Sequence, residues 1–273
     1  MMLFQKILSS AVRTAIIAAE SVHGHTFKAL VYRGPAACDG CPEAVAQLLK
    51  STPGMKIDVT YVGPDEEVKL NAEALEGVDV YVQPGGGDDV DETWKTDMKQ
   101  YYTEIRHFVE NGGRYLGFCL GAYLAGHTPG FDLLNKGDDV NTETERKGSQ
   151  VTNTNDTIIQ VDWTFASGKV EMKRWLYFQD GAVMVLGKNS DAKVLGRYSS
   201  NGDPAATLNQ FGDGWVGLVG PHPEADKSWY ADEDFVNPDG IKFDIGHDFV
   251  QTVLNAGHKP ETYEKLSVAC SPS

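Results

Sequence analysis

The chain has 273 residues, of which 41% are hydrophobic, and its formal net charge at pH 7 is -15. This length and composition allow one large domain with a sizeable buried core and exclude a disordered chain. The acidic charge repels phosphates and no basic stripe offsets it, so nucleic acid is not expected as a partner. No run of roughly 18 to 20 apolar residues is present, so no membrane is expected as a partner either.

The N-terminal residues 1–25 form a candidate signal peptide. Lys6 gives a positive start, residues 15–19 (AIIAA) give a short apolar run, and residues 19–21 (AES) give a small-x-small cleavage site. Arg13 interrupts the apolar region, so an amphipathic N-terminal helix is the alternative. The pattern predicts a secreted, extracellular protein, with a cytoplasmic one as the alternative.

The domain that follows is expected to cover residues 26–258, with a polar C-terminal tail at 259–273. No internal repeat, low-complexity block or long linker divides it, which predicts a single domain. Within it, Asn155-Asp156-Thr157 is a glycosylation sequon, so Asn155 is a candidate glycosylation site in an exported chain. The oligomeric state stays open.

Cys38 and Cys41 form a CxxC spacing just after the first strand candidate, residues 29–33. In an exported chain this spacing predicts a short disulfide between Cys38 and Cys41. In a cytoplasmic chain it is typical of a thiol redox motif, and two free thiols are the third alternative. One CxxC without a second pair cannot hold a structural zinc, so no metal and no other cofactor is expected.

The first half of the chain alternates short β-rich runs with helical patterns, which is typical of a parallel sheet covered by helices. In the longest helical pattern, apolar residues from Met98 to Val109 recur at steps of three and four, and Asn111-Gly112-Gly113 ends it. The predicted strands are residues 29–33, 56–62, 78–83 and 114–118, and the predicted helices are residues 42–50 and a helix between 91 and 110.

After residue 137 the composition changes. Residues 137–150 are polar and predict a loop, and a helix near residues 243–255 ends the domain. The β-like runs between them, which we expect to form mostly hairpins, are residues 157–163, 175–179, 182–187, 193–199 and 214–220. The predicted fold is an α/β domain, a flavodoxin-like parallel sheet flanked by helices, with a β-hairpin-rich second half.

The segment Gly117-Phe118-Cys119-Leu120-Gly121 joins the fourth strand to the next helix. It fits a nucleophile elbow, in which Gly117 and Gly121 let the chain turn sharply past the nucleophile. Such a turn places the sulfur of Cys119 at a helix N-terminus, which favours thiolate, and directs the amide of Leu120 to the oxyanion of an attacked carbonyl. A buried structural cysteine in an ordinary strand-to-helix turn is the alternative.

His222 is the candidate base for this thiol. It directly follows an apolar strand, with Glu224 two residues later. Residues i and i+2 of an extended segment point the same way, so Glu224 is placed to orient the imidazole while His222 faces Cys119. A histidine in this position is more often a surface residue, but the elbow cysteine earlier in the chain favours the catalytic interpretation.

A glycine-rich turn, QPGGGDD at residues 83–89, follows the third strand and can bring backbone amides close to a ligand. This turn, the GxCxG elbow and the late HPE, in this order, resemble the class I glutamine amidotransferase-like superfamily. More narrowly, residues 30–45, 82–89 and 112–126 resemble the amidotransferase-like N-terminal domain of eukaryotic biotin protein ligases, in its stand-alone and often exported fungal form. The resemblance covers residues 28 to 256 and implies the class I glutamine amidotransferase-like fold.

The resemblance also implies roles for five residues. Cys119 would be the nucleophile, His222 the general base and acid, and Glu224 its orienting partner, while the amides of Gly86 and Leu120 would form the oxyanion hole. The implied chemistry is attack on a carboxamide carbonyl, a thioester intermediate, release of ammonia or an amine, and hydrolysis by water.

The chain carries no synthetase domain that would use ammonia and no glycine- and arginine-rich biotinyl-adenylate loop, so no biotin ligase activity is expected. The predicted function is a Cys-His-Glu amide hydrolase of amidotransferase-like fold, acting on a small amide or γ-glutamyl substrate. The alternative is a non-catalytic ligand-binding or regulatory domain that keeps the fold.

Overall fold

The computed structural model describes residues 25–87 and 89–257. The candidate signal peptide, apart from its last residue, and the polar C-terminal tail lie outside these residues. In the described part of the chain, no helix is long and apolar enough to cross a membrane.

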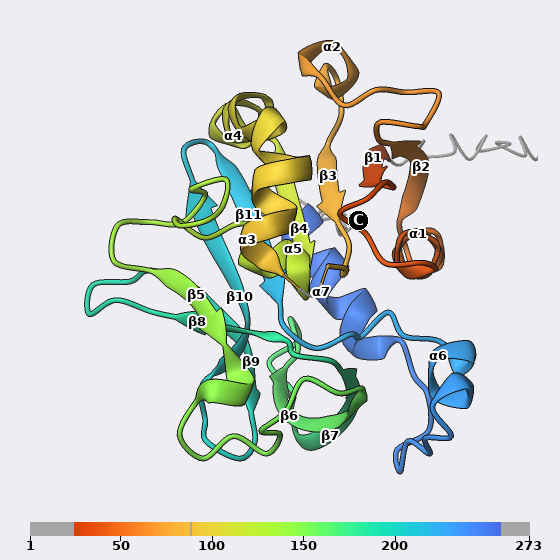
Figure 1. The fold of residues 1–273 in the computed structure, drawn as a ribbon, viewed down its shortest axis with the longest axis vertical. Helices are drawn as coiled ribbons and strands as arrows, with labels where there is room; N and C mark the ends of the chain where they lie inside the picture. Colours follow the sequence, from red (N-terminus) through yellow and green to blue (C-terminus); the bar gives the residue numbers. More distant parts are fainter. Residues whose placement is uncertain (1–24, 88, 258–273) are drawn as a thin grey trace, which may run out of the picture.

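A mixed sheet of nine strands forms the centre of the described residues (Figure 1). Its strands are β1 (Thr26–Tyr32), β2 (Lys56–Val62), β3 (Val80–Gln83), β4 (Arg114–Phe118), β6 (Thr157–Thr164), β7 (Val170–Phe178), β9 (Lys193–Tyr198), β10 (Pro204–Phe211) and β11 (Gly214–Val219). Their order is β2-β1-β3-β4-β11-β10-β9-β6-β7. The pairs from β2 to β11 are parallel and those from β11 to β7 are antiparallel, so the predicted parallel half and hairpin half belong to one continuous sheet.

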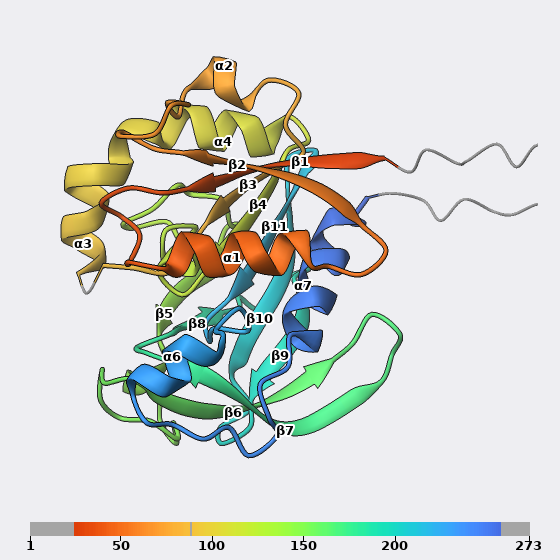
Figure 2. The same ribbon diagram turned by 90° about the vertical axis from the view of Figure 1, so that its right-hand side faces the viewer.

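Helices cover both faces of the parallel strands (Figure 2). On one face lie α1 (Cys41–Lys50) and α7 (Asp244–Leu254), and on the other lie α2 (Ala72–Leu75) and α4 (Tyr102–Glu110). Alternate residues of each strand serve the two cores, as the period of two requires. In β4, Leu116 packs in the core with α1 and α7, whereas its neighbour Tyr115 packs in the core with α4.

The helix predicted between residues 91 and 110 is present but not continuous. It consists of α3 (Val90–Thr93), a π-helical segment (Trp94–Met98), a 3₁₀ turn (Lys99–Tyr101) and α4. The wide π turn lets the ring of Trp94 pack edge-on against Phe131 and Tyr102 while Met98, Ile105 and Val109 remain buried. The predicted apolar face is therefore kept although the helical repeat changes.

Two strands of the second half were not predicted. β5 (Asp139–Thr142) lies inside the predicted loop and pairs with β8 (Ala182–Val185) in a separate two-stranded sheet. Its sequence, DVNT, has no apolar alternation, so the partner strand rather than the local pattern defines it. β10 begins with proline and contains two alanines, and it is nonetheless held between β9 and β11. Both differences are tertiary effects on weakly β-forming sequences.

Three neighbouring parallel strands, β3, β4 and β11, have their carboxyl ends at the same edge of the sheet. Each is followed by one of the motifs singled out in the sequence: the glycine-rich turn after β3, the cysteine elbow after β4 and the HPE segment after β11. In open α/β sheets this edge is where ligands bind. The topology thus brings together three segments that are far apart in the chain.

Candidate active site

Cys119 lies at the turn between β4 and α5 (Leu120–Tyr123) with φ 48° and ψ -106°. A positive φ is unfavourable for a residue with a side chain and costs on the order of 1 to 3 kcal/mol, so surrounding contacts must hold it. Here the Cys119 amide donates to the carbonyl of Val219 on β11, at 2.9 Å, and its own carbonyl accepts from Ala122 at 2.9 Å. The backbone therefore has the sharp strand-to-helix turn of a nucleophile elbow.

The two glycines of the elbow are required by close backbone contacts. A Cβ on Gly117 would lie 2.4 Å from the carbonyl oxygen of Gly121, and one on Gly121 would lie 2.2 Å from that of Gln83. These distances are too short for any side chain. The elbow is thus packed directly against the end of β3.

The predicted helix after the elbow is present and short. α5 has four residues, and the chain turns away after Tyr123. The dipole of one helical turn is small, so its contribution to a thiolate at Cys119 is smaller than that of a full helix. Leu120, the first residue of α5, lines the same cavity as Cys119, and the amide of a first helical residue has no acceptor within the helix.

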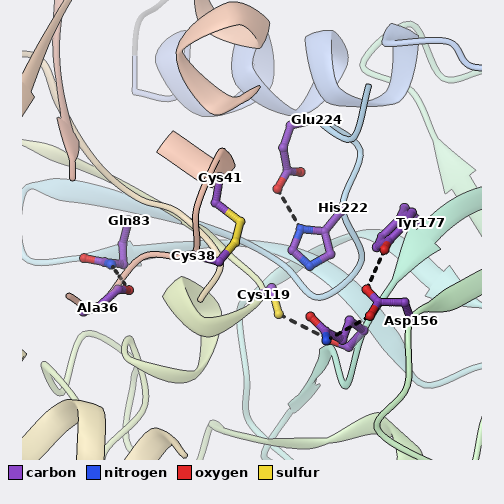
Figure 3. Close-up of a disulfide and its surroundings, with 10 residues drawn as sticks. Ala36, Cys38, Cys41, Gln83, Cys119, Asp156, Tyr177, His222 and Glu224 are labelled. Atoms are coloured by element: carbon purple, nitrogen blue, oxygen red, sulfur yellow. Dashed lines mark hydrogen bonds and ion pairs between the residues drawn. A yellow bond between two sulfur atoms is a disulfide. The ribbon is translucent and has the colours of Figure 1, made fainter. Parts of the chain in front are cut away.

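His222 and Glu224 lie beside Cys119, as Figure 3 shows. His222 Nδ1 bonds Glu224 Oε1 at 2.8 Å, and the imidazole stands between the carboxylate and the cysteine. His222 is 4% exposed, Glu224 is fully buried, and Cys119 is 8% exposed. With its proton held on Nδ1 by the carboxylate, the ring presents its other nitrogen, Nε2, to the sulfur.

The electrostatics of the pair favour a charged imidazole. Burial alone would lower the pKa of His222, but the charges of Glu224 and Cys119 outweigh it, and hydrogen bonds to both add to the effect, so the pKa is raised to about 10. The second oxygen of Glu224 has no hydrogen-bond partner among the described residues, which leaves its charge available to the ring. A protonated imidazole next to Cys119 is the state of His222 that these surroundings favour.

Gly85 shows how closely the two side chains approach. A methyl group built on it would lie 2.7 Å from Cε1 of His222 and 3.4 Å from Cβ of Cys119. A single methyl group would therefore fill the gap between the imidazole of His222 and the side chain of Cys119. The sequence drew attention to the glycine-rich turn but not to this glycine, because which of three adjacent glycines faces the ring depends on the tertiary contact.

Gly86 has φ 151°, and a Cβ on it would lie 2.5 Å from the amide nitrogen of Cys38. That amide donates to the carbonyl of Gly85 at 3.1 Å. The N–H and C=O of a trans peptide point in opposite directions, so the N–H of Gly86 points away from the amide of Cys38. Gly86 and Leu120 both line the cavity that contains Cys119, where two oxyanion donors would be needed.

Cys38 and Cys41 are joined by a disulfide, with Cα atoms 5.3 Å apart. The bridge closes the short loop that precedes α1 and contacts the glycine-rich turn through Cys38. Cys119 is a free cysteine in the described residues. The disulfide therefore braces one wall of the site and leaves the elbow thiol unpaired.

A cavity of about 900 Å³ opens in front of the sulfur and the imidazole. Its walls come from the elbow, the glycine-rich turn, the β7–β8 turn and α6 (Lys227–Asp232) with the segment after it. The exposed side chain of Asn155, the candidate glycosylation site, lies on the same cavity. The predicted catalytic, oxyanion and disulfide residues thus all gather at this one place.

Several residues of this site were not found from the sequence. Tyr177 of β7 accepts the backbone amide of His222 at 2.9 Å, and its ring packs edge-on against the imidazole. Its hydroxyl donates to Asp156, and the carbonyl of Gln179 accepts from Cys119 Sγ at 3.5 Å. These residues come from the antiparallel half of the sheet, and only strand pairing brings them to the elbow.

His127, which was not the candidate base, lies outside the cavity of Cys119. His127 pairs with Asp132, a contact that its sequence spacing did not suggest, but it lines a different pocket from Cys119. In residues 25–87 and 89–257, no group of three or more His, Cys, Asp or Glu side chains is arranged to hold a metal ion.

Solved structures with a similar fold include two glutamine amidotransferases. One, from Thermotoga maritima, has a TM-score of 0.56 at 13% sequence identity and covers 85% of this chain and 100% of its own. The other has a TM-score of 0.50 at 17% identity and covers 76% of this chain and 96% of its own. At these identities the likeness shows the fold alone. Among curated proteins, none matches the chain significantly in sequence.

The sequence model of the family described as "Biotin-protein ligase, N terminal" matches residues 27–243. This match spans most of the described chain and includes the glycine-rich turn, the elbow and the HPE segment. It agrees with the resemblance seen in the sequence. The chain therefore belongs to the biotin-protein ligase N-terminal family and has the class I glutamine amidotransferase-like α/β fold.

Proposed function

We propose that the protein is a cysteine hydrolase that cleaves a carboxamide or γ-glutamyl bond through a thioester intermediate. One observation carries the proposal: a buried imidazole, bonded to a buried carboxylate, faces a cysteine at a sharp elbow on an open cavity. Nucleophile, base and orienting group in this relation form the arrangement that nucleophilic acyl transfer requires.

In the proposed reaction the Cys119 thiolate attacks the carbonyl carbon, and the π electrons move to the oxygen. The amides of Gly86 and Leu120 donate to this oxyanion, which is the largest single stabilisation in such reactions. When the tetrahedral intermediate collapses, the C–N bond breaks and imidazolium His222 gives its proton to the leaving nitrogen. Ammonia or an amine departs and an acyl thioester remains on Cys119.

The second half of the reaction uses water. Neutral His222 takes a proton from a water molecule, whose oxygen attacks the thioester carbonyl, and the C–S bond breaks. The carboxylic acid leaves, and the thiolate and imidazolium are restored. Glu224 holds the ring in one orientation with the proton on Nδ1 and stabilises its charge throughout.

The test is release of ammonia or amine from a panel of glutamine, γ-glutamyl and simple amide compounds, with Cys119→Ala beside the unchanged protein. We expect activity in the unchanged protein and a loss of roughly 10⁴-fold or more in the variant, because removal of a nucleophile leaves only binding and the oxyanion hole. Activity that survives Cys119→Ala would end the proposed mechanism.

A second measurement addresses the thiol without a known substrate. At pH 6.5, iodoacetamide should label Cys119 rapidly, and His222→Ala should remove that speed, since the imidazolium maintains the thiolate. Cys270→Ser is the matched control and should leave the rapid labelling unchanged. Slow labelling that does not depend on His222 would instead favour a non-catalytic binding domain.

A further inference from the structure

The cavity in front of Cys119 is lined by three carboxylates: Asp156, Asp180 and Glu233. No Lys or Arg of the described residues lines it, so the imidazole of His222 is the cationic group on its wall. Fixed negative charge on several sides of a partly enclosed space selects ligands of positive charge.

These carboxylates differ from other acidic side chains of the molecule, several of which have basic partners. Within the described residues none of the three forms an ion pair. Asp156 accepts from the hydroxyl of Tyr177 and from Gln179, and Asp180 accepts from Thr144 at 2.9 Å, all neutral donors. Neutral donors orient a carboxylate without cancelling its charge, so the negative charge at the cavity wall remains for a ligand.

The negative charge of Asp156 affects the pKa of Tyr177. Its pKa is raised, first by burial and then by its hydrogen bond to Asp156 and the charge of that carboxylate. Asp180 is held in place as well, since its carbonyl accepts from the hydroxyl of Tyr123 at 2.8 Å. Asp156 and Asp180 are therefore anchored parts of the wall, whereas Glu233 is an exposed residue that lines the same cavity.

The side of the cavity next to His222 is aromatic. The ring centroid of Trp229 lies 5.1 Å from that of His222, and Phe235 lines the same wall. Glu233, the C-cap residue of α6, lies four positions after Trp229, and both line the cavity. A carboxylate beside an indole ring provides the two interactions by which proteins bind an alkylammonium group.

The chemistry assigns a part of the substrate to this wall. Because His222 protonates the leaving nitrogen, the leaving group must lie beside the imidazole, and thus against Trp229, Phe235 and Glu233. Ammonia would leave this space unfilled, since the whole cavity of about 900 Å³ is of the size that holds a much larger ligand. The wall therefore fits an amine with a carbon chain.

We infer that the preferred substrate is a secondary amide whose leaving group is an amine with a second, positively charged group, such as a diamine joined to an acyl or γ-glutamyl group. This inference rests on the proposed hydrolase function for the place of the leaving group. The carbon chain lies on Trp229 and Phe235, and the terminal ammonium is bound by Glu233 and the carboxylates of the cavity.

The first test compares three γ-glutamyl amides with one acyl group and one chain length. Their leaving groups are pentylamine, 1,4-diaminobutane and 5-aminopentanoate, which end in a methyl, an ammonium and a carboxylate group. We expect kcat/KM for the diamine to exceed that for pentylamine by about tenfold, and the carboxylate to be poorest. Equal values, or a preference for the carboxylate, would overturn the inference.

The second test does not need turnover. Cys119 is alkylated with 2-bromoethylammonium and with iodoacetate, and each rate is divided by that of a small free thiol. The imidazolium of His222 itself attracts the anionic reagent, so the measure is the change in the cation-to-anion ratio when a cavity charge is removed. Glu233→Gln should lower this ratio about threefold. Asp232→Asn, an exposed neighbour that does not line the cavity, should leave it unchanged.

The two tests separate the two proposals. A lower ratio in Glu233→Gln alone, without hydrolysis of any amide by the unchanged protein, would support cation binding and contradict the hydrolase. Hydrolysis that favours the diamine, together with the lower ratio, would support both. A ratio that is the same in the unchanged protein, Glu233→Gln and Asp232→Asn would overturn the inference, whether or not amides are hydrolysed.

Discussion

Three histidines of the described residues pair with a carboxylate, and two of them, His222 and His127, differ in that only His222 lies beside a nucleophile. His222 bonds Glu224 at the cavity of Cys119, and His127 bonds Asp132 in a separate pocket. The contacts are of the same kind. A histidine–carboxylate pair is therefore not a catalytic site by itself, and its surroundings decide what it can do.

The carboxylates differ in burial and in partners. Glu224 is fully buried, and one of its oxygens has no hydrogen-bond partner among the described residues. The side chain of Asp132 is 38% exposed and also pairs with Arg106 at 2.7 Å, so water screens its charge and a second cation shares it. Burial lowers the pKa of both histidines and the carboxylates raise it, but only His222 is raised to about 10.

The largest expected difference comes from removing each imidazole. His222→Ala should lower kcat/KM for amide hydrolysis by 10² to 10⁴-fold, roughly the contribution of a general acid-base group. His127→Ala should change it less than about twofold, because that ring lies in a different pocket from Cys119. Steady-state kinetics on any amide that the protein cleaves measures both. Equal losses in the two variants would show that the pairs are not functionally different.

A smaller effect is expected from the gap between the ring and the cysteine. The methyl group of Gly85→Ala would overlap Cε1 of His222, and a displacement of about 1 Å at a reacting group costs on the order of 10²-fold in rate. In the His222→Ala background the same substitution should cost almost nothing, since the ring it displaces is absent. A double-mutant cycle on kcat/KM measures this coupling. Additive losses would contradict the proposed contact.

The pH dependence should distinguish the two carboxylates. The imidazolium of His222 is required to protonate the leaving group, so kcat should fall as pH rises through its pKa of about 10. Glu224→Gln removes the larger of the two charges that raise this pKa, and should move the alkaline limb down toward the ordinary value of about 6.5. Asp132→Asn should leave the limb in place. Profiles of kcat against pH for the three proteins test this, and an unmoved limb in Glu224→Gln would refute it.

The same pKa has a consequence for stability. Because the folded-state pKa of His222 lies above that of an unfolded chain, its proton stabilises the fold fully below about pH 6.5, and this stabilisation disappears as pH rises to about 10. The free energy of unfolding should therefore decrease over that range. The decrease should be smaller in Glu224→Gln, where the two pKa values are closer together. Urea unfolding at a series of pH values measures both slopes.

Local patterns predicted the parts of the site that local geometry fixes. The elbow around Cys119 needs two glycines in any fold, and the spacing of His222 and Glu224 places both side chains on one side of an extended segment. The strands β2 and β4 were predicted with their observed bounds, because each has a strong apolar pattern. These features depend on residues only a few positions apart.

The remaining features depend on long-range contacts. Tyr177 belongs to the far antiparallel edge of the sheet, yet an isolated bridge pairs it with His222. Asp156 becomes part of the cavity through the same fold-back. β5 was predicted as a loop because its stability comes from β8 and not from its own sequence. A sequence pattern has no information about which distant strand will lie beside it.

The smallest effect is expected from the disulfide, which braces the Cys119 site and has no counterpart at the His127 pocket. The bridge closes a loop of only four residues, so Cys38→Ser/Cys41→Ser should lower the free energy of unfolding by about 2 kcal/mol. The hydrogen bond from the amide of Cys38 to the carbonyl of Gly85 orients the glycine-rich turn. If loss of the bridge also breaks this bond, alkylation of Cys119 should become slower. Reductant should lower the free energy of unfolding of the unchanged protein by the same amount, and it should have no effect on the double variant. If reductant alters neither unfolding nor alkylation, the loop is held by α1 and the turn without the bridge.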